Sequence, residues 1–139
     1  MRTRTWLADL PTPECAALLE LSWLGRLGVT VDGHPEIFPV NHAFDRARGR
    51  ILFPTNARTK LHAALSQPLV AFEVDGVDED GASAWSVLVV GRATEETDRR
   101  AIAAAMRARR AAWAVSETTR WLRIDPVRVT GRRIALVEG

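Results

Sequence analysis

The sequence predicts a mainly β (α+β) domain, in which a small antiparallel barrel carries helices at its edges. Three observations lead to this prediction. Short apolar runs with period-two alternation recur along the chain, turn residues separate them, and only a few segments show helical spacing. A chain of 139 residues is long enough for one ordinary core. We therefore expect a single domain over residues 1–139 with six or seven strands.

The first expected element is a helix. Thr12 is placed to cap it, Pro13 suits the first helical position, and Gly25 is expected to end it. Apolar residues follow at helical spacing, and Cys15 lies among them. Cys15 is therefore expected to be a small core residue.

The next segments alternate between strand and helix patterns. Asp32-Gly33 is a turn pair that favours a hairpin between two strands. The expected elements are strands over 26–31, 36–44, 51–53, 69–74, 84–93, 121–124 and 127–137, and helices over 58–65 and 95–113. The acidic, glycine-containing segment 76–82 is expected to be a loop. The run 84–93 is apolar on both faces, which indicates a strand central to a barrel or an interface.

Charge and composition limit the class of protein. Residues 1–98 carry 9 basic and 14 acidic side chains, whereas residues 99–139 carry 10 basic and 3 acidic ones. The basic C-terminal third could meet an anionic ligand, but no basic-plus-aromatic recognition motif accompanies it, so no nucleic-acid partner is expected. The sequence contains no apolar run long enough to span a bilayer and no signal-peptide pattern, and it has one cysteine. We expect a cytoplasmic protein that does not bind membranes.

The sequence contains no recognisable set of catalytic side chains. None of the three histidines has a cysteine or carboxylate at metal-ligand spacing, so no metal site is expected. The sequence also has no Gly-x-Ser-x-Gly elbow and no context typical of a catalytic cysteine. We therefore assign no catalytic side chain, and any reaction would depend on a bound cofactor.

The stretch Ile51–Lys60 is the strongest candidate for a binding site. An apolar strand runs directly into a helix start, where unpaired backbone N–H groups and the helix dipole attract anions. Two hydroxyls and two cations add to this turn: Thr55, Thr59, Arg58 and Lys60. Lys60 is the one lysine in a chain with 18 arginines. The turn predicts a ligand that carries phosphate.

Four segments in order resemble the pyridoxamine 5′-phosphate oxidase-like family of flavin split barrels. They are residues 35–42 (PEIFPVNH), 51–60 (ILFPTNARTK), 67–72 (QPLVAF) and 85–92 (WSVLVVGR). The segments 121–126 and 131–133 are similar to the last two strands of that family. The resemblance covers about residues 14–133, which is most of the chain.

The resemblance implies a six-stranded antiparallel split barrel with Greek-key topology, which works as a homodimer with FMN at the subunit interface. By the same resemblance, Thr55, Arg58, Thr59 and Lys60 bind the FMN phosphate. Phe38, Pro39, Val40 and Asn41 line the flavin ring. Trp85, Ser86 and Val87 face the flavin, in some members from the partner subunit. Trp121, Arg123 and Arg132 are candidates for the far wall of the site.

The function implied is that of an FMN-dependent oxidoreductase that exchanges hydride or electrons with a small organic substrate. His42 stands where the pyridoxamine phosphate oxidases proper have a basic residue for the substrate phosphate, so that particular reaction is not expected. One alternative is a deazaflavin-dependent reductase, whose longer acidic cofactor tail would use the arginine-rich C-terminal third. Another is a non-catalytic flavin- or haem-binding protein.

Overall fold

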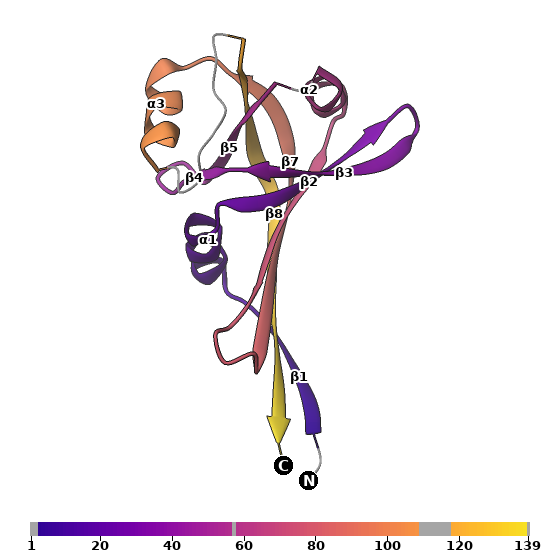
Figure 1. Cartoon of the computed structure of the whole chain (residues 1–139), viewed down its shortest axis with the longest axis vertical. Coiled ribbons are helices and arrows are strands. Elements are labelled where there is room, and N and C mark those ends of the chain that lie inside the picture. The colour runs from indigo at the N-terminus through magenta and orange to yellow at the C-terminus, as the bar shows by residue number, and fades with distance from the viewer. Residues whose placement is uncertain (1–2, 57, 109–117, 139) are drawn as a thin grey trace.

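The computed structural model describes residues 3–56, 58–108 and 118–138 (Figure 1). Its elements are β1 (Thr3–Asp9), α1 (Thr12–Leu21), β2 (Leu24–Val31), β3 (His34–Asn41), β4 (Ala43–Asp45), β5 (Arg50–Thr55), α2 (Arg58–Ser66), β6 (Val70–Val77), β7 (Ser83–Glu96), α3 (Arg99–Ala108) and β8 (Arg120–Glu138). None of the helices in these described ranges is long and apolar enough to cross a membrane.

All the strands belong to one antiparallel sheet in the order β3-β2-β6-β7-β8-β5-β4, and β1 pairs with the C-terminal end of β8. The sheet stays open, because no pairing within the described chain joins β3 to β4. Figure 1 shows β1 and the end of β8 reaching away from the rest of the molecule, with α2 and α3 near the opposite end. The mainly β class with peripheral helices is confirmed, but the sheet has eight strands rather than six or seven.

Two expectations near the N-terminus are wrong. No strand was expected before the first helix, yet Thr3–Asp9 pairs with β8. The helix has Pro11 rather than Thr12 at the N-cap position, and it ends at Leu21 because Ser22 takes an extended conformation, with φ of −81° and ψ of 149°. Gly25, expected to end the helix, lies inside β2 instead. A side chain there would overlap the ring of Phe72, so its role is close packing rather than helix termination.

Two further expectations are wrong at the C-terminal half. β7 continues to Glu96, so α3 starts at Arg99 rather than at residue 95, and residues 109–113 lie outside the described residues. The two strands expected around Asp125-Pro126 are one continuous strand, β8. The pairing with β7 shifts in register between Val90 and Gly91, opposite Pro126, and this bulge allows β8 to continue through the proline.

The core lies between the inner face of the sheet and the helices α1 and α2. Val70, Phe72 and Val74 are all buried, as their alternation predicted, and Cys15 is buried beside them. A smaller apolar cluster lies under α3, formed by Ala43, Leu52, Ala105 and Trp121. Two separate clusters therefore lie on the two sides of β5, since Leu52 belongs to one and Phe53 to the other.

His42 is a structural residue at the junction of β3 and β4. Its ring is buried and lies edge-on to Phe72, with ring centroids 5.0 Å apart. Its Nε2 lies 3.1 Å from the carbonyl oxygen of Leu19, so Nε2 donates the hydrogen bond. Nδ1 is buried without a hydrogen-bond partner among the described residues. Burial lowers the pKa of His42 to about 4, because a charged imidazole would lose its hydration there.

The neutral state of His42 predicts acid sensitivity of the fold. Between pH 6.5 and about 4 the unfolded chain takes up a proton that the folded chain does not, so stability falls as pH falls through this window. The loss should reach about 3 kcal/mol, from a pKa difference of roughly 2.5 units. The measurement is urea unfolding across this pH range for the wild type and for His42→Gln, which keeps a donor near Leu19 but does not titrate. Identical pH profiles for the two proteins would contradict this assignment.

Candidate functional site

The turn from β5 into α2 forms where the sequence predicted it, and residues 55–60 are called the phosphate turn below after the ligand that the sequence predicts. β5 ends at Thr55, which is buried, and α2 begins at Arg58. Arg58 and Thr59 are exposed in the first turn of this helix, and Lys60 is half-buried. No acidic residue lies in the first turn of α2. The backbone N–H groups, a hydroxyl and two cations thus gather at one helix start, which suits an anion.

Lys60 and Phe38 come together from distant parts of the sequence. The Nζ of Lys60 lies 5.8 Å from the centroid of the Phe38 ring, at the distance of a cation–π contact. Burial lowers the pKa of Lys60, so the ammonium loses part of its hydration in this position. An anion bound beside it would compensate for that loss. The contact therefore links the phosphate turn to β3, the strand expected to line a flavin ring.

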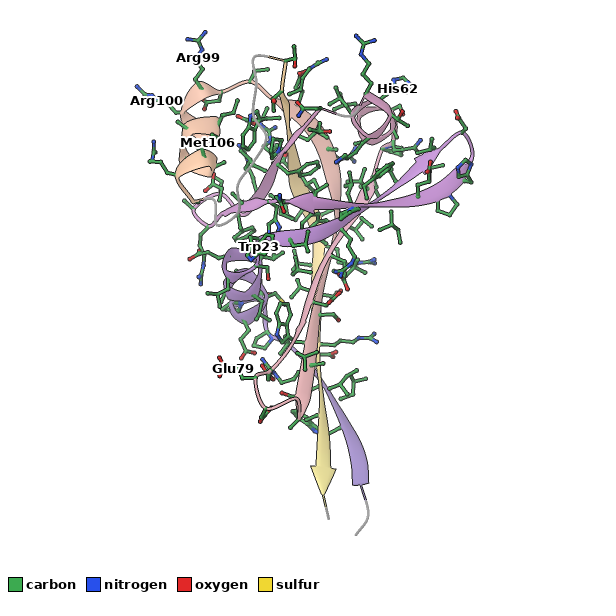
Figure 2. All side chains as sticks on the ribbon, viewed as in Figure 1. Trp23, His62, Glu79, Arg99, Arg100 and Met106 are labelled. Atoms are coloured by element: carbon green, nitrogen blue, oxygen red, sulfur yellow. The ribbon has the colours of Figure 1, made fainter. Side chains whose placement is uncertain are left out.

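Two hollows flank α2. One, of about 410 Å³, lies between α2 and the β2–β3 hairpin, and the other, of about 540 Å³, lies toward β8 and includes Arg120. Both are lined by Arg58, His62 and Ser66. Figure 2 shows His62 on α2. His62 lies four residues after Arg58, and this spacing, which places both side chains on one face of the helix, is the sequence signal that could have identified it.

The candidate residues of β3 divide between the two faces of the strand. Val40 is buried in the core and Phe38 packs against the core, whereas Pro39 is exposed on the opposite face. Asn41 at the end of the strand is partly exposed. Strand alternation explains this division, because neighbouring side chains point to opposite faces. Phe38 is the candidate in β3 that contacts the phosphate turn.

The candidates in β7 lie in a different part of the sheet. Val87 is fully buried in the core, and the Trp85 ring lies close against Gly76, where a Cβ atom would be 2.7 Å from Cζ2 of the tryptophan. Ser86 points to the other face, between Asp75 and Arg132 in the register. Because Val87 is a core residue, it is not available to a ligand in the single chain.

The three candidates in β8 occupy three different environments. Trp121 is buried under α3 with Leu52 and Ala105. Arg123 is held by two carboxylates, with Nη1 at 2.7 Å from Glu96 and Nε at 3.0 Å from Asp125. Arg132 is exposed. The single chain therefore does not gather these residues into a far wall.

A third hollow, of about 420 Å³, lies under α3 and has several alanines and the side chains of Arg48 and Arg100 in its lining. Figure 2 shows Arg99 and Arg100 on α3, well apart from His62 on α2. The arginines of α3 therefore do not extend the phosphate turn. This separation removes part of the support for a deazaflavin whose tail would use them.

Comparisons with known proteins place these features in context. A family model described as pyridoxamine 5′-phosphate oxidase matches residues 11–133. Among curated proteins, the uncharacterised protein Rv0080 of Mycobacterium tuberculosis is 32% identical over 133 residues, which is 92% of this chain and 86% of that protein.

Solved structures with the same fold include two flavin-binding proteins. The FAD-binding protein from Mycobacterium smegmatis is 37% identical, with a TM-score of 0.76 over 92% of this chain and 98% of its own. An FAD-binding protein from Mesorhizobium loti superimposes with a TM-score of 0.80 over 95% and 99% of the two chains. At 22% identity, that second likeness shows the fold alone.

The ion pairs of Arg123 predict that its role is structural. Arg123→Met would leave the buried carboxylate of Glu96 without its cation, so the free energy of unfolding should fall by about 2–3 kcal/mol. Arg92→Met is the matched control, because Arg92 is exposed and makes no ion pair among the described residues; its effect should stay within about 0.5 kcal/mol. Urea unfolding measures both. Equal losses for the two variants would show that the network does not stabilise the fold.

Proposed function

Because this chain belongs to the pyridoxamine 5′-phosphate oxidase family, we propose that it binds a flavin nucleotide and exchanges hydride or electrons with a small organic substrate. The observation that carries this proposal is the half-buried Lys60 at the start of α2, in contact with Phe38. A cation in this position offers a phosphate both charge and an N–H-rich helix end.

The residues present fit the phosphate end of such a cofactor. Arg58, Thr59 and Lys60 occupy the first turn of α2, where Arg58 lines both hollows beside the helix and Thr59 lines one of them. Phe38 supplies a flat apolar surface on β3, in contact with Lys60. A flavin contributes the redox chemistry once it is bound. The chain binds its phosphate, orients its ring against β3 and excludes water from it.

Two cofactors fit this proposal, FMN and FAD. FMN needs only the phosphate turn and a surface for the ring. FAD is favoured by the 37% identical FAD-binding protein and by the two hollows along α2, which leave room beyond the turn for an adenylate half. His62 and Arg58 would then line the continuation of the site.

We also propose that the site is completed in a homodimer. The single chain brings Lys60 and Phe38 together, but Ser86 and Arg132 lie on the opposite face of the sheet from the core. A second copy could supply these residues to the cofactor, as the family resemblance implies for the strand that carries Trp85 and Ser86. The proposed unit is therefore two chains with cofactor at their interface.

The absorption spectrum of the protein as purified distinguishes the proposed cofactor class from its rivals, because flavin, deazaflavin and haem absorb differently. Turnover with a reduced nicotinamide would then separate an oxidoreductase from a flavin carrier. A protein that takes up neither FMN nor FAD would contradict the proposal.

Lys60→Ala is predicted to weaken flavin binding through the phosphate. Losing one charge-assisted contact should cost about 1.5–3 kcal/mol, or roughly a 10- to 100-fold rise in Kd. The loss should appear for FMN and FAD and should be absent for riboflavin, which has no phosphate. Fluorescence titration of the three ligands measures this.

The matched control is Arg107→Ala, which removes an exposed cation from α3 without touching α2. Its affinity for all three ligands should equal that of the wild type. An equal loss of riboflavin affinity in Lys60→Ala would mean that Lys60 acts on the ring or on the fold rather than on the phosphate.

A further inference from the structure

The hollow under α3, called the α3 hollow below, has the size and lining of a ligand site. It lies between α3 and the hairpin of β4 and β5, at the upper left of Figure 1, and its volume is about 420 Å³. The buried part of its lining is apolar and includes Ala43, Leu52 and Ala105. Trp121 is buried against these residues. The volume is within the range of small-molecule sites, and the lining suits an apolar ligand.

The α3 hollow exists because α3 turns its smallest side chains toward the hairpin. Its alanines at spacings of three and four residues share one face of the helix and line the hollow: Ala101, Ala104, Ala105 and Ala108. The larger side chains of Ile102 and Met106 pack on the apolar cluster around Trp121 and are not part of this lining. Contacts between elements are normally filled to close packing. α3 is therefore attached through its large residues and leaves a space along its alanines.

Two arginines and one carboxylate also line the α3 hollow. Arg48 lies 3.8 Å from Asp45 across the turn after β4, which is a long distance for an ion pair. Arg100, at the start of α3, makes no ion pair with any residue that the structure describes. Asp98 accepts a hydrogen bond of 2.9 Å from the backbone N–H of Arg100, so its carboxylate caps the helix rather than pairing with the guanidinium. The charged groups of the lining therefore sum to +1, from two cations and one anion.

This charge balance favours a ligand with one negative charge. A carboxylate matches the sum of +1 and accepts two N–H groups from a single guanidinium. A phosphate dianion would place a second negative charge beside Asp45, and the repulsion disfavours it. The rest of the ligand should be apolar, because a polar group against alanine and leucine side chains would lose its hydrogen bonds to water.

We propose that the α3 hollow binds a monocarboxylic acid with an apolar body. The carboxylate pairs with Arg100, and Arg48 is the second cation within the hollow. The hydrocarbon part lies against Ala104, Ala105 and Leu52. Removing this hydrocarbon from water supplies most of the affinity, and the guanidinium selects the acid over a neutral molecule of the same shape.

The proposed acid site goes beyond the flavin proposal and does not depend on it. None of the residues that line the α3 hollow is a candidate for the flavin site. Figure 2 shows Arg100 on α3 well apart from His62 on α2, the helix that carries the phosphate turn. The two proposals can therefore fail separately.

Isothermal titration calorimetry of the full chain with sodium octanoate at pH 8 tests the proposal. Neutral 1-octanol and dianionic octyl phosphate should both bind more weakly than octanoate. Arg100→Gln should raise the Kd of octanoate by about 10- to 100-fold, because one charge-assisted contact is lost, and should leave the Kd of 1-octanol unchanged. Arg107→Gln is the matched control, since Arg107 is an exposed cation of α3 outside the lining of the hollow. Its Kd values should equal those of the wild type.

Filling the α3 hollow gives a second readout. Ala104→Phe places a ring in the space for the hydrocarbon and should abolish octanoate binding, and the fold should persist because Ala104 is exposed. Ala103→Phe is the matched control, an exposed alanine of α3 outside the lining, and it should bind octanoate like the wild type. If circular dichroism shows that Ala104→Phe does not fold, Ala108→Phe tests the same wall.

Three results would overturn the proposal: a wild type that does not bind octanoate, octanoate binding that survives Ala104→Phe, or a Kd that Arg100→Gln leaves unchanged. Octyl phosphate that binds more tightly than octanoate would overturn the choice of a monoanion. The flavin absorption of the same samples is the separate readout for the flavin proposal, which stands if flavin is retained while octanoate fails to bind.

Discussion

The pairing of β7 with β8 is the constraint on which the rest of the structure depends. β8 pairs with β7 from Trp121 to Ala135, with β5 at its start and with β1 at its end. This continuity survives Pro126, which has no N–H to donate, because the register shifts between Val90 and Gly91 at that point. Gly91 permits the close approach, since a Cβ atom there would lie 2.5 Å from the carbonyl oxygen of Asp125. This register shift thus keeps β8 continuous, so that it pairs with β5, β7 and β1 in a single sheet.

The same continuity determines where the functional candidates lie. β8 runs through the whole molecule, so residues far apart along it have different surroundings. Trp121 lies under α3, Arg123 is in the ion-pair network, and Arg132 is on the face of the sheet opposite the core. These three candidates therefore cannot form one site in one chain. The residues of the phosphate turn, in contrast, lie close together in one chain. It lies at the junction of a short strand and a short helix, and α2 itself carries Lys60 to Phe38. The cofactor proposal therefore depends most strongly on α2 and β3.

Features that depend on a few neighbouring residues were predicted correctly from the sequence. Asp32-Gly33 forms the expected turn, with φ of 48° and 84°, and the strand-to-helix turn before Arg58 lies where its residues indicated. The pairing of strands that are far apart in the sequence could not be predicted from such local patterns. β1 is a strand because it pairs with residues more than 120 positions away, and Pro126 suggested a break although β8 continues through it with a bulge at Val127. The position of Trp121 under α3 likewise depends on packing between distant elements, which one sequence does not reveal.

The edges of the sheet give an independent argument about the single chain. Two of them are protected: β3 carries Pro35 and Pro39, and β4 has three residues and lies against α3. β1 is a third edge, seven residues long, without proline or lysine and with exposed Trp6 and Leu7. An edge of this kind invites pairing or docking unless another chain covers it. The open edge at β1 and the division of the candidate cofactor residues between two faces of the sheet both support the proposed homodimer.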